Sequence, residues 1–118
     1  MRAVLLACVL WLAPACASLP GERPVASAYS IEQQAYALLQ AYALILEEAA
    51  RVVADPATPA AVKQALVRAE RVATPAAEAL ALALRAHLAA RSDASERQLV
   101  DASRYAQAAM QGLAEAIP

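Results

Sequence analysis

Few side chains in this 118-residue chain can do chemistry. His87 is the single histidine, and the two cysteines, Cys8 and Cys16, both lie near the start. The sequence has no Glu-x-x-His, no CxxC, no Gly-rich phosphate loop and no G-x-S-x-G. One histidine and no free cysteine in the mature form argue against Cys-His and Ser-His-Asp catalysis, unless a partner supplies residues. The sequence therefore predicts a protein that is not an enzyme and that holds no metal and no cofactor.

His87 has two interpretations. It could be a haem or metal ligand, with Met110 as the second ligand. We favour a plain helix residue near a C-terminus, where a cation interacts well with the helix dipole.

Cys16 stands at a different kind of site. Arg2 precedes an apolar run of about eleven residues, "AVLLACVLWLA" (3–13), which is the length of a signal peptide and too short to span a bilayer. Small residues, "APA" (13–15), then come directly before Cys16. This order predicts a signal peptide over 1–15, with cleavage before Cys16.

The letters "LAPAC" resemble the lipobox of bacterial lipoproteins. Ala15 and Cys16 agree with that pattern, whereas Ala13 replaces the usual leucine and Pro14 follows it. The resemblance implies that the Cys16 thiol carries diacylglycerol and anchors the chain to a membrane. The alternative is an ordinary signal ending in "ACA" (15–17), which leaves a soluble periplasmic or secreted product. A second box, "LLAC", ends at Cys8, but too few residues precede it to form an apolar region.

The segment 16–29 reads as a flexible tether. It contains Pro20, Gly21 and Pro24, so it should stay extended or irregular. A dozen such residues reach at most about 40 Å. Ala17 and Ser18 lack the acidic residue that, in lipoproteins of this kind, favours inner-membrane retention. We therefore expect the periplasmic side of the outer membrane.

Residues 30–118 should form an all-α domain. Alanine fills 35 of the 118 positions, and apolar residues recur at alternating spacings of four and three. The first helix should start at the capping box "SIEQ" (30–33) and end at Asp55-Pro56. The second should start with Thr58 as cap and Pro59 as its first residue, and run to 91. The third should start in "SDASE" (92–96), capped by Asp93 with Glu96 or by Ser92.

Pro75 decides how many helices there are. It removes a backbone donor and favours a break, which would give four short helices. The apolar spacing nevertheless passes through 71–75 without a change of phase, which favours one kinked helix. We therefore expect an up-down-up three-helix bundle with a kinked central helix.

Three groups of side chains could form surfaces. A partner or a second copy could bind to Leu80, Leu82, Leu84 and Leu88, or these leucines could be the core of the central helix. Tyr29, Tyr36 and Tyr42 could contact a partner, but amphipathic packing is the simpler interpretation. The same holds for Arg68, Arg71 and Arg85, which could meet lipid headgroups or form a solvated face.

Charge excludes one class of partner. The chain has 10 basic and 11 acidic residues and no basic stripe, so nucleic acid is not expected. In general style the chain is similar to small Ala-rich lipoproteins of bacteria and prophages, a loose likeness that supplies no site residues. The expectation is a membrane-tethered envelope lipoprotein that binds or scaffolds. A phage-encoded envelope factor acting in lysis or exclusion, and a soluble periplasmic helical chaperone or inhibitor, are the alternatives.

Overall fold

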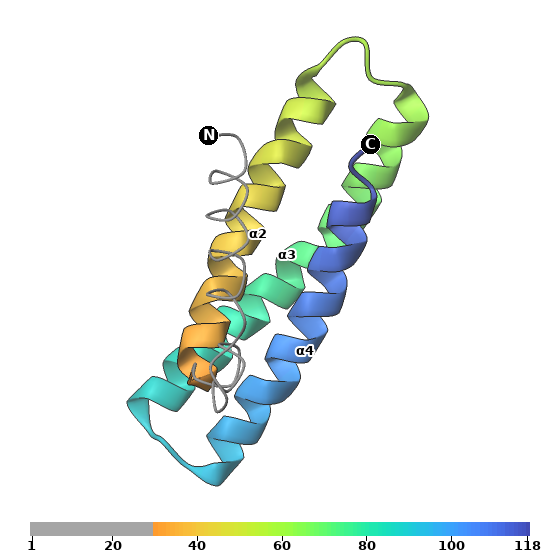
Figure 1. The fold of residues 1–118 in the computed structure, drawn as a ribbon. Coiled ribbons are helices and arrows are strands. Elements are labelled where there is room, and N and C mark those ends of the chain that lie inside the picture. Colours follow the sequence, from red (N-terminus) through yellow and green to blue (C-terminus); the bar gives the residue numbers. More distant parts are fainter. Residues whose placement is uncertain (1–29) are drawn as a thin grey trace, which may run out of the picture.

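The computed structural model describes residues 30–118, which form three helices: α2 (Ile31–Ala54), α3 (Ala60–Ala89) and α4 (Asp93–Glu115). Short connections make neighbouring helices antiparallel, and each helix contacts both others, α3 and α4 most extensively (Figure 1). The predicted all-α, up-down-up three-helix bundle is confirmed. The predicted signal peptide, tether, Cys16 and Tyr29 lie outside the described residues.

The start of α2 follows the predicted capping box. The Gln33 backbone N–H donates to Ser30 Oγ at 3.2 Å, and the Ser30 N–H donates to Gln33 Oε1 at 3.0 Å. These two bonds satisfy donors that the first helical turn leaves unpaired. The helix ends at Ala54, and Asp55, the residue before Pro56, is already extended.

Helix α3 runs without interruption through Pro75, which lies near the middle of its 30 residues. The four-helix alternative is therefore wrong. The ribbon of α3 changes direction near its middle (Figure 1), as expected where a proline cannot donate to the carbonyl one turn earlier. The helix ends at Ala89, two residues before the predicted end at 91.

The predicted start of α3 was wrong by one residue. Pro59 occupies the cap position and Ala60 is the first helical residue, while Thr58 makes no capping bond. The Pro59 carbonyl accepts the N–H groups of Val62 at 3.0 Å and Lys63 at 3.2 Å. The backbone of the proline thus starts the helix, and a side-chain cap is not used.

The structure selects one of the two caps considered for α4. Ser92 is the cap: its hydroxyl accepts the Ser95 N–H at 3.1 Å, and Ser95 Oγ accepts the Ser92 N–H at 3.0 Å. The pairing of Asp93 with Glu96 as a capping box was wrong. Both carboxylates still lie in the first turn, where they favour the positive end of the helix dipole.

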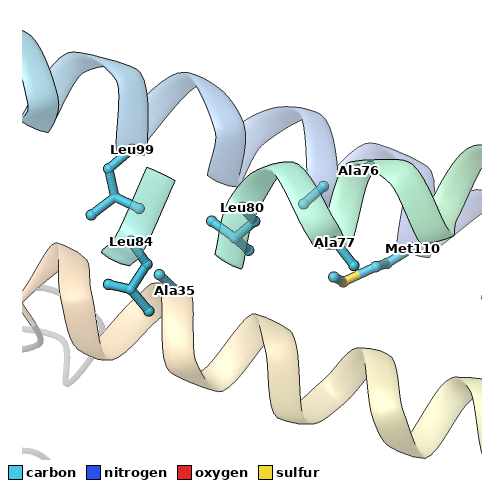
Figure 2. Close-up of a cluster of buried hydrophobic side chains, with 8 residues drawn as sticks. Ala35, Ala76, Ala77, Leu80, Leu84, Leu99 and Met110 are labelled. Atoms are coloured by element: carbon cyan, nitrogen blue, oxygen red, sulfur yellow. The ribbon is translucent and has the colours of Figure 1, made fainter. Parts of the chain in front are cut away.

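The core is narrow because alanine supplies half of it. One cluster joins all three helices around Leu80, Leu84 and Leu99 (Figure 2), and a smaller one lies nearer the α2–α3 connection. Small side chains let the helices approach closely, so the larger residues of α2 are only half-buried. Within residues 30–118, no helix is long and apolar enough to cross a membrane. The buried apolar residues are Ala35, Ala49, Leu66, Ala73, Ala76, Ala77, Leu80, Leu84, Leu99, Ala106, Met110 and Leu113.

Candidate functional site

The partner surface expected on α3 does not form as one patch. Leu80 is fully buried and Leu84 is 3% exposed, so both belong to the core (Figure 2). Leu82 and Leu88 are exposed, at 62% and 41%. Residues six apart on a helix point to different faces, so these two leucines do not make a common surface. Of the two interpretations of these leucines, the core of the central helix holds for Leu80 and Leu84, because the 4-residue spacing between them follows the inward face.

An apolar groove lies elsewhere, between α2 and the first half of α3. Its volume is about 320 Å³. Val53 and Val67, on opposite sides of the groove, are 37% and 40% exposed. Nothing in the 4-3 periodicity of the sequence shows that α3 leaves Leu46 and Val53 partly uncovered. The lining residues are Leu46, Ala49, Ala50, Val53, Ala54, Leu66, Val67 and Glu70.

The two sides of the groove carry net charges of opposite sign, although Glu70 of α3 lines the groove and Arg51 lies on α2. On α3, Lys63, Arg68 and Arg71 gather around Val67. No ion pair among residues 30–118 involves these three cations. Arg68 and Arg71 are two of the three arginines for which a solvated face was predicted, and they lie with Lys63 beside an apolar groove.

On α2 the exposed charged side chains are Glu47, Glu48 and Arg51. Glu47 and Glu48 both bond to Arg51, at 2.7 and 3.0 Å. The Glu47 carboxylate is the main cause that raises the pKa of the Arg51 guanidinium. All three side chains are at least half exposed, so these pairs contribute little to stability.

The opposite end of the bundle is polar. His87 of α3 is buried, and its Nδ1 lies 2.8 Å from Ser95 Oγ of α4. Its Nε2 lies 3.3 Å from Glu32 Oε1 of α2, which is also 3.5 Å from Arg91 Nη2. One imidazole therefore joins all three helices. The prediction of a helix residue near a C-terminus was correct in position but missed this role, since no sequence pattern pairs residue 87 with residue 32.

Glu32 is held in its charged form. Its own backbone N–H is the first cause that lowers the pKa of its carboxyl group, followed by the Ser30 hydroxyl, with Arg91 and His87 adding to the effect and burial opposing it. The carboxylate thus interacts with the first turn of α2 and also lies 3.3 Å from His87 Nε2.

The contacts of His87 link a serine, a histidine and an acid: Ser95, His87 and Glu32. The sequence argued against catalysis by such a set. The Ser95 hydroxyl is not available to attack a substrate, because other hydrogen bonds occupy it. Ser95 Oγ also lies within hydrogen-bond distance of the Ser92 N–H and of the carbonyls of Ala90 and Ser92. A hydroxyl has one proton and two lone pairs. The two carbonyls compete for the proton, and the N–H and the hydroxyl of Ser92 donate to the lone pairs. We interpret the cluster as a clamp that closes the end of the bundle.

The remaining candidates are separate from one another. Met110 lies fifteen residues after Ser95 on the same helix, about 22 Å away, so it cannot share a ligand with His87. Among residues 30–118, no group of three or more His, Cys, Asp or Glu side chains could hold a metal ion. Tyr36 and Arg85 are exposed. Tyr42 is half-buried, and its hydroxyl bonds to Thr74 Oγ1 at 2.7 Å, which agrees with amphipathic packing.

Comparison of the chain with known protein families, with curated proteins and with solved structures found no match.

Proposed function

We propose that the protein is a membrane-tethered envelope lipoprotein, in which a lipid on Cys16 anchors a helical binding or scaffolding module. The observation that carries the proposal is the order of segments along the chain. A basic residue and an apolar run end at "LAPAC", a Pro-containing segment follows, and a helical body begins at Ser30.

The two ends of the bundle support a binding role. The polar end, with His87 and Glu32, contains Ser30 and therefore adjoins the proposed tether. The apolar groove is lined by the second half of α2 and the first half of α3. The α2–α3 connection lies at the other end of the bundle from the start of α2 (Figure 1). A chain tied at residue 16 would thus present its apolar groove away from the point of attachment.

Palmitate labelling tests the anchor. The full gene is expressed in a Gram-negative host that is fed a clickable palmitate analogue, and the purified protein is examined for label. We expect label on the wild type and on Cys8→Ser, and none on Cys16→Ser. Cys8→Ser is the matched control because it removes the other thiol from the same apolar run.

Two results would contradict the proposal. The first is an unlabelled wild type, and the second is equal label on Cys16→Ser. The mass of the mature N-terminus identifies the alternative, because cleavage before Ser18 leaves a product with no cysteine.

Membrane fractionation tests the location. We expect the labelled wild type in the outer membrane and Ala17→Asp in the inner membrane, since an acidic residue after the lipidated cysteine favours retention in the lipoproteins that this signal resembles. An inner-membrane wild type would contradict the proposed location and leave the anchor intact.

A further inference from the structure

We infer that a second copy of this chain covers the groove, with α2 of each copy packed against α3 of the other. This inference gives the proposed binding module its partner, and it rests on the proposed function only for its membrane setting.

The first argument is the apolar groove itself. Val53 and Val67 are more than one-third exposed, and a cavity of about 320 Å³ lies between the two helices that carry them. Along the outer side of α2, Ala43, Ala50 and Ala54 are exposed and share one helical line with Glu47. Their small side chains let another helix lie close to α2.

The second argument is the position of the charges along the axes of α2 and α3, which is called their height below. The bond between Tyr42 and Thr74 puts these residues at the same level of the antiparallel pair α2 and α3. Glu47, five residues after Tyr42, is then level with about residue 69, between Arg68 and Arg71. The acidic and basic sides of the groove therefore carry their charges at the same height.

A two-fold axis parallel to the helices, between two copies, would cover the groove and bring the opposite charges together. Rotation about this axis keeps each residue at the same position along the bundle and exchanges the two sides of the groove. Helix α2 of one copy then faces α3 of the other and runs antiparallel to it. Glu47 of each copy then meets Arg71 of the other, and the contact occurs twice. Arg71 lies one turn after Val67, on the same side of α3.

Charge also favours a second copy over a lipid surface. An anionic bilayer would attract Lys63, Arg68 and Arg71 but repel Glu47 and Glu48 on the other side of the groove. Another copy of the chain offers both signs in the required places.

The available area is suited to a modest dimer. Helix α2 is about 36 Å long, and two adjacent helices are about 20 Å wide, which gives about 700 Å² for each copy. Standard interfaces bury about 800 Å² from each partner. Attachment of both copies to one membrane would raise their effective concentration and favour pairing.

Charge exchange tests the arrangement. Full-length chains with two different tags are co-expressed, and one tag is used for purification while the other is measured. We expect wild type to co-purify with wild type. We expect the amount of co-purified chain to fall about tenfold when both tagged chains carry Glu47→Arg, and likewise when both carry Arg71→Glu. Each of these pairings places like charges together twice. Glu47→Arg with Arg71→Glu should regain the wild-type signal, since both contacts are then of opposite sign.

Glu48→Arg is the matched control. It disturbs the same Arg51 pairing but lies about 100° around α2 from Glu47, so it should co-purify with itself as wild type does. Circular dichroism melts of the purified variants check that each is folded.

Several outcomes overturn the inference: no co-purification of wild type, no loss in either single variant, or no recovery in the mixed pair. Palmitate label is measured on the same samples. Labelled wild type without co-purification would reject the dimer and keep the anchor, whereas co-purification of unlabelled wild type would reject the anchor and keep the dimer.

Discussion

At the scale of single residues, His87 holds one end of the bundle together. A buried imidazole is tolerated in a protein interior when its nitrogens find partners, and here Glu32 and Ser95 come from the two other helices. The pKa of Glu32 is lowered chiefly by its own backbone N–H and the Ser30 hydroxyl, and Arg91 and His87 add to the effect. This end of the bundle should therefore respond to acid.

Glu32→Gln tests that response. Because folding lowers the pKa of Glu32, its contribution to stability is present above the ordinary Glu pKa and is lost as pH falls through the lowered value. The variant should therefore be less stable than wild type at about pH 7, and the gap should be smaller at about pH 3. Urea unfolding at the two pH values measures the gap. Glu78→Gln, at an exposed position of α3, should show no such narrowing gap. An equal gap at both pH values would mean that the charge of Glu32 is not the cause.

At the scale of elements, α3 shows how packing maintains a helix across a proline. Pro75 loses one backbone bond, which costs about 3 kcal/mol or more. The neighbouring Ala73, Ala76 and Ala77 are buried in the core, and Thr74 bonds to Tyr42 across the α2–α3 interface. These contacts keep both halves of α3 against the other helices.

Two substitutions separate these effects. Pro75→Ala restores the missing donor, so it should raise stability or leave it unchanged once packing at the bend is included. On helix propensity alone, Thr74→Ala would be neutral or stabilising. The bond to Tyr42 reverses this, and we expect a loss of about 1 kcal/mol.

Tyr42→Phe is the matched partner for Thr74→Ala. It should cost a similar amount, and the double variant should lose little more than either single one, because both remove the same bond. Thermal melts of the three proteins measure this. Strictly additive losses would show that the hydroxyl pair is not coupled.

At the scale of the whole molecule, the bundle has a thin core and two unlike ends. Six of its twelve buried apolar residues are alanine, so stability depends on a few leucines that reach between the helices. The polar end is closed by His87, whereas the other end leaves the α2–α3 groove open.

Leu80→Ala and Leu82→Ala compare a core leucine with an exposed one on the same helix. Leu80 is fully buried, so its truncation should cost about 2–5 kcal/mol. Leu82 is 62% exposed, so its truncation should change stability by no more than about 0.5 kcal/mol. Urea unfolding followed by circular dichroism measures both. Similar losses in the two variants would contradict this division between core and surface.

What the sequence determined by itself was local and periodic. Alanine content and 4-3 spacing predicted three helices, Ser30 and Gln33 predicted the first cap, and an unbroken phase predicted that α3 passes through Pro75. These features depend on residues within one or two turns of each other, so the sequence displays them directly. The errors at 58–60 and 92–96, of one residue and of one cap, arose where several adjacent residues could each begin a helix.

Only the tertiary structure decided which side chains meet across helices. It buried Leu80 and Leu84, paired His87 with Glu32 and Ser95, joined Tyr42 to Thr74, and left a groove beside Val67. Each of these depends on the rotation, bend and separation of whole helices. An alanine-rich sequence specifies those quantities weakly, because small side chains fit many helix packings equally well.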